Sequence, residues 1–346
     1  MAEVLGLGLT HYPALIRDEN MTRALKADLK SKRVPEAAKD PASWPQAMRA
    51  EWADDEGHAT GVAHRERCFA ASRAMRAELD RFRPDAVVIF GDDQYENFVD
   101  DVVPPFCVFA LGDIESQPLP AAWNNPWGEP RDKTFRHQGE PRIARYLINR
   151  LAERNVALPY AYRLRFERGL AHAFANTLLL LDVDRTGFAH KIVPFHVNCY
   201  GGDLIRSHGG SAAPDDIAGE PDPPAPSPAV CFDLGRMLAR VCVESPWRIA
   251  LVASSSWSHA FLTPKYHYLR PDVESDRERF VELEQGRLER WRALSGKQLE
   301  AAGQHEMLNW IVLAGAMHEL GRRARIVDWV ETYVMNSTKC FAVFDA

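Results

Sequence analysis

A histidine near the amino terminus has a setting that suits metal ligation or proton transfer. His11 lies in the segment LTHYP at residues 9–13, directly after an apolar run. Pro13 disfavours helix at the residue before it and stiffens the chain where the run ends. An imidazole held at the end of a strand can bind a metal or exchange a proton near neutral pH. Read alone, His11 is equally consistent with a strand-end histidine that hydrogen-bonds to a neighbouring loop.

A dense polar cluster, GDDQYENF at residues 91–98, follows a second apolar run. Its members include Asp93, Gln94 and Tyr95. So many carboxylates and amides at a strand exit suit a hard cation or a polar substrate. An Asx-type turn is the simpler alternative, but it needs only Asp92 or Asp93 and leaves the rest of the cluster unexplained.

A second histidine follows an apolar run in the serine-rich segment SSSWSHAF, residues 254–261. A serine-hydrolase pair of Ser258 and His259 is disfavoured. The G-x-S-x-G motif is absent, and adjacent residues rarely pair as nucleophile and base. We therefore interpret His259 as a lone acid or base.

Glu306 opens an apolar helical run within HEMLNW, residues 305–310. Because a helix turns by about 100° per residue, only one of His305 and Glu306 can face a site. Asn309 stands where the H-E-x-x-H motif needs its second histidine, so the zinc-protease class is excluded. Taken alone, Glu306 is better read as a first-turn glutamate favoured by the helix dipole. His172 and His196, taken singly, are more typical of hydrogen-bonded core or loop histidines.

Alternating strands and helices would position these residues. Apolar, β-branched runs predict strands at Val4–Leu9, Ala86–Phe90, Phe106–Leu111, Ile192–Val197 and Ile249–Ala253. Periodic patterns predict helices at Ala59–Phe82, Arg142–Glu153, His172–Leu181, Asp233–Val243, Asp276–Leu294 and Glu306–Leu320. Such alternation predicts an α/β fold with a central, mostly parallel sheet flanked by helices. In these sheets, ligand-binding and catalytic residues usually lie in the loops after the carboxyl ends of the strands.

The chain is expected to form a single catalytic domain over residues 1–346. Two stretches rich in proline and polar residues, about 116–141 and 207–228, are predicted to be long loops. The second could mark a domain boundary. We prefer to read it as a long loop within one domain, because the strand and helix patterns on its two sides look like continuations of one sheet.

Composition excludes several classes of protein. A formal charge of -6 and a pI near 6.1, without any Lys/Arg-rich run, disfavour nucleic-acid binding. No cleavable leader and no apolar run long enough to span a bilayer are found, so a cytoplasmic protein is expected. The 6 cysteines lack a C-x-x-C pair and are expected to be reduced thiols. A small-molecule partner is the default, and a homo-oligomer is the commonest state for a soluble enzyme.

Taken in chain order, these motifs resemble the class III extradiol dioxygenase family, whose familiar member is the β subunit of protocatechuate 4,5-dioxygenase. The resemblance runs from the first strand to the Glu306 helix, which is most of the chain. Its motifs are LTHYP, the acidic cluster, VPPF at 103–106, PFHVN at 194–198, SH at 258–259 and E-x-x-x-W at 306–310. Each motif is short, so the resemblance to the family rests mainly on the order in which the motifs occur along the chain. GDDQYENF and SSSWSHAFLT look most like the 3-O-methylgallate dioxygenase branch.

The resemblance implies an enzyme that opens a catechol- or gallate-type ring with O2, using non-haem Fe(II) held by two His and one Glu. His11 and Glu306 would be metal ligands, and His259 the acid/base residue, with His172 as a second catalytic histidine. Manganese in place of iron stays open. The substrate would contact a set of polar residues comprising Asp93, Tyr95, His196 and Ser258.

One position departs from the family pattern. Gln94 stands where the family usually places its second iron-binding histidine, and a neutral amide is a weaker ligand for Fe(II) than imidazole. Gln94 could ligate or orient a water, or His64 could replace the missing imidazole, with His58 as a more distant candidate. If the metal is lost, the chain would be a non-catalytic protein that binds an aromatic ligand or a partner. A metal-dependent enzyme of different chemistry is the other alternative.

Overall fold

The computed structural model describes residues 3–17, 21–119, 124–201 and 222–346. At its centre lies a sheet of eight strands in the order β6-β3-β7-β2-β8-β1-β10-β9. The strands are β1 (Val4–Leu9), β2 (Ala86–Gly91), β3 (Phe106–Phe109), β6 (Tyr160–Ala161), β7 (Ile192–Val197), β8 (Ile249–Ser254), β9 (Arg325–Val330) and β10 (Lys339–Phe344). A separate pair joins β4 (Asp113–Ser116) to β5 (Phe135–Gln138). The predicted α/β fold with a mostly parallel sheet is confirmed.

The middle of the sheet is parallel. Strand β8 pairs in parallel with β1 on one side and with β2 on the other, and β2 pairs in parallel with β7. Every residue of these four strands is buried, as expected where helices cover both faces of a parallel sheet. Their carboxyl ends therefore lie along one edge. Antiparallel strands β3 and β10 flank this central group.

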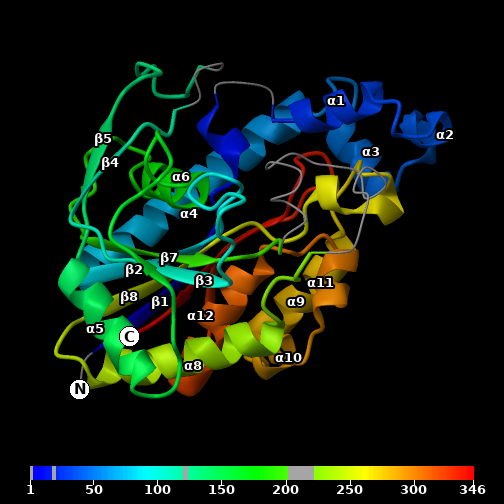
Figure 1. Cartoon of the computed structure of the whole chain (residues 1–346). Helices are drawn as coiled ribbons and strands as arrows, with labels where there is room; N and C mark the ends of the chain where they lie inside the picture. Colours follow the sequence, from blue (N-terminus) through cyan, green and yellow to red (C-terminus); the bar gives the residue numbers. More distant parts are fainter. Residues whose placement is uncertain (1–2, 18–20, 120–123, 202–221) are drawn as a thin grey trace.

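Helices cover both faces of the sheet (Figure 1). The longer helices are α1 (Arg23–Lys30), α3 (Gln46–Trp52), α4 (His58–Phe82), α5 (Pro141–Ala152), α6 (His172–Leu181), α8 (Pro228–Glu244), α9 (Val273–Glu284) and α12 (Met307–Glu319). Short helices are α2 (Glu36–Lys39), α10 (Glu289–Arg292) and α11 (Gly296–Ala301), with 3-10 turns at Pro13–Ile16, Pro41–Ser43, Ala260–Leu262 and Pro264–Tyr266. Within β2, Val88 and Phe90 pack with α5, α8 and α12, whereas Val87 and Ile89 pack with α4 and α6. The alternation of side chains along a strand thus divides the core into two layers.

Several elements differ from the sequence-based predictions. The predicted helix Asp276–Leu294 is two helices, α9 and α10, and the break between them contains Gly286 at φ +69°. The predicted loop 116–141 contains strand β5. Strands β9 and β10 were not predicted. Most of the predicted loop 207–228 lies outside the described residues.

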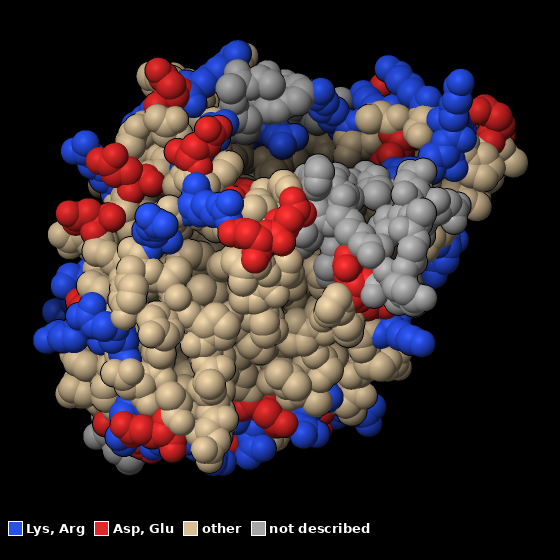
Figure 2. Space-filling view, in the orientation of Figure 1, with Lys and Arg blue, Asp and Glu red and all other residues tan. Residues whose placement is uncertain are grey.

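The surface is charged mainly around its rim in the view of Figure 2, and the middle of this face, over β3 and α8, carries few charged side chains. No continuous basic surface is visible on this face. Among the described residues, no helix is long and apolar enough to cross a bilayer. All six cysteines are buried with free thiols.

A glycine on β1 allows α12 to pack closely against the sheet. A Cβ atom built on Gly8 would lie 2.1 Å from the ring of Trp310. Trp310 is fully buried, and its indole nitrogen donates a hydrogen bond to the Ser255 carbonyl at 3.1 Å. Because Trp310 lies one helical turn beyond Glu306, this contact also fixes where Glu306 sits.

We expect Gly8→Ala to lower the free energy of unfolding by roughly 1–3 kcal/mol, because the added methyl group overpacks a filled core. Gly112→Ala is the matched control, since no atom lies within 4 Å of a Cβ built there. Chemical denaturation of both variants measures the difference. Equal stability of the two variants would contradict the close packing of β1 and α12.

Candidate functional site

A cavity of about 270 Å³ lies at the carboxyl edge of the parallel strands. Five of the predicted site residues line it, namely His11, Gln94, His172, His259 and Glu306. His11, Gln94 and His259 follow β1, β2 and β8, while His172 begins α6 and Glu306 stands directly before α12. The other lining residues are Tyr12, Pro13, Ala14, Arg17, Met21, Arg23, Ala24, Ala27, Phe261 and Asn336.

The imidazole of His11 is held with one nitrogen turned into the site. Its Nδ1 lies 2.8 Å from the Ser254 carbonyl oxygen, which can only accept a hydrogen bond, so Nδ1 carries the proton. Nε2 is then left with a lone pair, 3.6 Å from Oε2 of Glu306 and 3.8 Å from Oδ1 of Asp92. Burial lowers the pKa of His11 to about 4, so the ring is neutral. A neutral imidazole whose second nitrogen is fixed by a carbonyl is the usual form of a metal-binding histidine.

Glu306 offers an oxygen with no protein partner. The hydroxyl of Tyr200 donates a hydrogen bond to Oε1, whereas Oε2 is buried and accepts none from the described residues. Oε2 lies 3.6 Å from Nε2 of His11 and 3.5 Å from Nε2 of His259. Burial and the nearby carboxylate of Asp92 raise the pKa of Glu306 well above its ordinary value. A buried carboxylate oxygen facing two imidazole nitrogens needs either a proton or a cation.

A network of buried polar groups holds the His259 loop. The Ser258 hydroxyl donates to the Ala302 carbonyl at 2.6 Å and accepts from the amide of Asp272 at 2.7 Å. The Ser258 amide donates to Oδ1 of Asp276 at 3.0 Å. Burial lowers the pKa of His259 to about 3, so this imidazole is neutral.

His172 forms a pair with Glu96. Nδ1 of His172 lies 3.0 Å from Oε2 of Glu96, and the backbone amide of His172 donates to Oε1 at 2.8 Å. Burial by itself would lower the pKa of His172, but the carboxylates of Glu96, Asp92 and Glu306 raise it to about 10. The rings of His172 and His11 meet edge to face, with centroids 5.1 Å apart.

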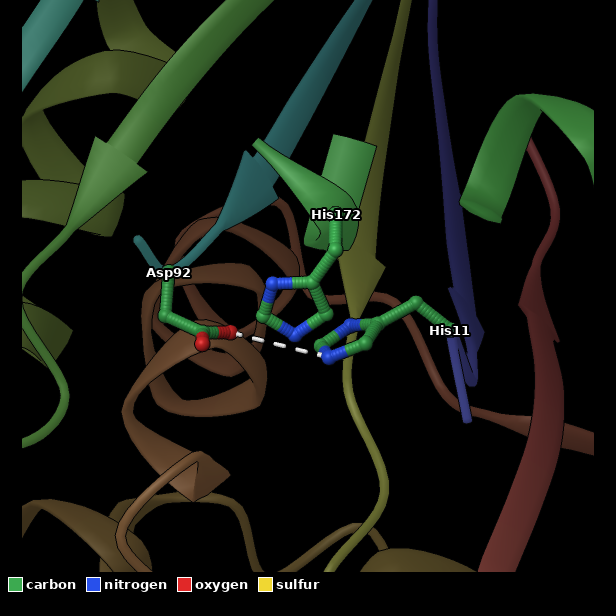
Figure 3. A group of neighbouring side chains, drawn as sticks. All are labelled: His11, Asp92 and His172. Atoms are coloured by element: carbon green, nitrogen blue, oxygen red, sulfur yellow. Dashed lines mark ion pairs between the residues drawn. The ribbon is translucent and has the colours of Figure 1, made fainter. Parts of the chain in front are cut away.

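Asp92 joins the two histidines in one cluster (Figure 3). One ligand atom from each of His11, Asp92 and His172 lies within 4.8 Å of the other two. Asp92 is fully buried, and its nearest hydrogen-bond donors are distant, the amides of Gln94 at 3.4 Å and Asn309 at 3.5 Å. The cluster therefore offers two imidazoles and a carboxylate, with a second carboxylate, Glu306, beside His11.

Several predicted site residues lie elsewhere. His64 is a predicted replacement ligand, but its Nδ1 lies 3.1 Å from the sulfur of Met335. Helix α4 turns His64 toward the loop after β9, which contains Met335. His196 is enclosed in the core, with its ring centroid 4.6 Å from that of Phe98. Neither residue lines the cavity.

The other predicted substrate contacts have local structural partners. Asp93 accepts hydrogen bonds from the amides of residues 96–98, so the Asx-type alternative describes it correctly. Tyr95 donates to Asp100 at 2.7 Å. Ser258 is used in the network around His259. Asp93, Tyr95 and Ser258 are absent from the cavity lining.

Residues that sequence reasoning missed complete the site. Asp92 is adjacent to the predicted Asp93, and only the direction in which the chain leaves β2 distinguishes the two. Glu96 lies in the same polar cluster, but nothing in the sequence pairs it with His172. Tyr200 approaches Glu306 from 106 positions away along the chain, a contact without a local sequence signal.

The donor set fits a divalent transition metal. Imidazole nitrogens suit iron, and carboxylate oxygens suit manganese as well as iron. Both His11 and His259 are neutral and turn Nε2 toward the unpartnered Oε2 of Glu306. The excess of buried carboxylate over fixed positive charge at this point favours a bound cation.

Comparisons with known proteins give one family and several relatives. Residues 222–340 match the model described as the catalytic LigB subunit of aromatic ring-opening dioxygenase. The chain is similar to 2,3-dihydroxyphenylpropionate/2,3-dihydroxicinnamic acid 1,2-dioxygenase 2 of Pseudomonas putida, 28% identical over 37% of this chain and 35% of that one. The corresponding enzyme of Paraburkholderia phymatum is 26% identical over 54% of this chain and 47% of its own. That of Paraburkholderia xenovorans is 28% identical over 78% and 85%. The chain thus spans less than half the length of the first two relatives.

The network around His259 predicts a pH-dependent stability. Burial raises the pKa of Asp276 from 3.8 to about 7. Folding therefore takes up a proton between these values, and the contribution of Asp276 to stability falls as the pH rises through them. Asp276→Asn removes this titration while keeping an oxygen for the Ser258 amide. From pH 5 to pH 8, the free energy of unfolding of the native protein should drop relative to the variant by on the order of 2 kcal/mol. Urea titrations at both pH values measure this, and parallel pH dependences would contradict it.

Proposed function

We propose that the chain, which resembles the catalytic LigB subunit of aromatic ring-opening dioxygenase over residues 222–340, is a class III extradiol dioxygenase that opens the ring of a catechol- or gallate-type aromatic compound with O2. The observation that carries the proposal is the convergence of His11, His259 and Glu306 on one cavity, with Oε2 of Glu306 unpartnered between the two imidazoles. This arrangement suits an enzyme better than a passive binding protein, because a buried polar atom without a hydrogen-bond partner is costly and is typical of functional sites.

The cavity favours a small aromatic acid as substrate. Its inner end is formed by the histidines and Glu306, while Arg17 and Arg23 line it elsewhere and Phe261 supplies an aromatic wall. An aromatic diol could therefore place its hydroxyls at the inner end and a carboxylate toward the arginines. The relatives named above are dihydroxyphenylpropionate dioxygenases. Their names do not support the expected 3-O-methylgallate branch, and we include both kinds of acid among the substrates to be tested.

The proposed cofactor is a divalent metal, with Fe(II) preferred over Mn(II). His11 through Nε2 and Glu306 through Oε2 would hold it. When bound, the metal would supply a common binding point for the diol oxygens and O2 and the electron density that O2 activation needs. The hydrogen bonds from His11 to Ser254 and from Tyr200 to Glu306 keep these ligands in place before any metal arrives.

Two histidines are suited to opposite proton transfers. His259 is neutral, because burial lowers its pKa to about 3, and its Nε2 faces the site, where it could accept a proton from a substrate hydroxyl that binding has made acidic. His172 is held by Glu96 through Nδ1, and the surrounding carboxylates keep its pKa high enough for the ring to carry a proton. Neighbouring groups whose surroundings push their pKa values apart are well suited as a base and an acid. We propose these roles for His259 and His172.

Oxygen uptake by protein loaded anaerobically with Fe(II) tests the proposal. Dihydroxyphenylpropionate, protocatechuate, gallate, 3-O-methylgallate and simple catechols would each be offered beside metal-free protein. We expect iron-dependent uptake with a ring-opened product for at least one aromatic acid. Bound iron without uptake for any diol would point to a different metal-dependent chemistry, and failure to bind iron or manganese would favour a non-catalytic binding protein.

Glu306→Gln should abolish stoichiometric iron binding and with it oxygen uptake. The amide is close in size to the carboxylate and can still accept from Tyr200, but it lacks the charge that a divalent metal needs. Glu300→Gln, on the exposed surface of α11, removes the same charge six residues away and should change neither property. Metal analysis of the purified variants gives the readout. Full iron content in Glu306→Gln would overturn the ligand assignment.

Glu96→Gln should slow turnover about 100-fold or more, within the range for loss of general acid catalysis, while iron content stays unchanged. Without the Glu96 carboxylate, the pKa of His172 falls, so the alkaline limb of the pH profile of kcat should move to lower pH. Asp100→Asn removes a charge from the same loop at an exposed position and serves as the control. An unmoved alkaline limb in Glu96→Gln would exclude His172 as the acid.

A further inference from the structure

The position of Gln94 raises the question of which group completes the metal site. All three side-chain contacts of Gln94 use its amide nitrogen, which lies 2.9 Å from the Tyr200 hydroxyl, 3.4 Å from Asp92 and 3.5 Å from Glu306. Rotating the amide would turn its oxygen toward two carboxylates, so hydrogen bonding favours the observed orientation. An amide nitrogen has no lone pair to offer a metal. Gln94 is therefore a hydrogen-bond donor to the acidic groups and not a ligand.

Asp92 has the properties expected of a metal ligand, which Gln94 lacks. It is the first residue after β2, it is fully buried, and Oδ1 lies 3.8 Å from Nε2 of His11. Among the described residues, its hydrogen-bond donors are the neutral amides of Gln94 and Asn309, at 3.4 and 3.5 Å. The protonated His172 is the nearby positive charge, but it faces Glu96 and Glu306 as well as Asp92, so a cation shared by the two buried carboxylates would offset the cost of burying them more fully.

On the basis of the proposed function, we propose that Asp92 is the third protein ligand of the metal, in place of an imidazole at position 94. Gln94 then acts as a positioning residue whose amide bridges Asp92, Tyr200 and Glu306. The protein ligands become one imidazole, from His11, and two carboxylates. This is a harder donor set than two imidazoles and one carboxylate, and it suits Mn(II) relatively better.

Titration of the metal-free full-length protein with Mn(II), followed by EPR, tests the assignment without any turnover. Asp92→Asn should weaken Mn(II) binding more than about 100-fold, because even residues that only orient ligands cost about 10–100-fold. Asp93→Asn is the matched control. It removes the same charge from the next residue, which faces backbone amides, and it should leave the affinity within the range of the native protein. Circular dichroism verifies that both variants fold.

A rescue variant and a count of ligands make the test independent of that single change. Adding Gln94→His to Asp92→Asn should restore at least a tenth of the native Mn(II) affinity by supplying a second imidazole. In the native protein, pulsed EPR of bound Mn(II) should detect one coordinated imidazole, and in the double variant two. This count needs only the native fold, so it applies even if Asp92→Asn does not fold.

Three results would overturn the assignment. Native affinity in Asp92→Asn would remove Asp92 from the ligands, and two imidazoles in the native protein would point to His172 instead. No rescue by Gln94→His in a folded double variant would contradict the exchange of ligands between positions 92 and 94. If the native protein binds no Mn(II) or Fe(II) at all, the metal premise of the proposed function fails as well, which distinguishes that failure from a wrong ligand.

Discussion

Two carboxylates, Asp92 and Glu306, are kept in the interior beside His11, and much of the surrounding structure offsets the cost of holding them there. Neutral donors from Gln94 and Tyr200 reach them, and His172 contributes positive charge through its elevated pKa. These groups come from the ends of different strands and helices, so only the assembled sheet can gather them. The sheet therefore acts as the scaffold of the site, and the negative charge at its edge is what makes the site suited to a metal.

The same surroundings separate the histidines chemically. His11 and His259 lie where burial dominates and both stay neutral, whereas His172 sits against Glu96 and holds a proton. Three identical side chains within one cavity thus differ in charge, since two imidazoles are neutral and the third carries a proton. The difference arises from which neighbour faces each ring, and not from the histidines themselves.

Much of the fold could be predicted from the sequence. β1 and β7 have the predicted bounds, because apolar runs buried on both faces are easily read between turn residues. The edge strand β9 is only partly buried and lacks that signal.

In the site, residues at strand exits and helix starts, such as His11 and Glu306, do reach the cavity. Which further residues line or contact the site depends on the direction in which the backbone leaves each strand or helix. Asp93 faces its own loop while Asp92 faces the site, and no periodicity distinguishes two adjacent acids at a strand end.

The order of strands also determines when the site can exist during synthesis. β1 lies between β8 and β10, so its first residue, Val4, pairs with Ile249, and Gly6 pairs with Phe344. During synthesis, β1 has no neighbour until the chain has reached β8 at Ile249, and its second neighbour, β10, follows only at Lys339. Until then its apolar side chains are exposed, which makes early chaperone contact advantageous. Because β10 is the last of the described strands in chain order, β1 is paired on both sides only after nearly all of the described chain has been made.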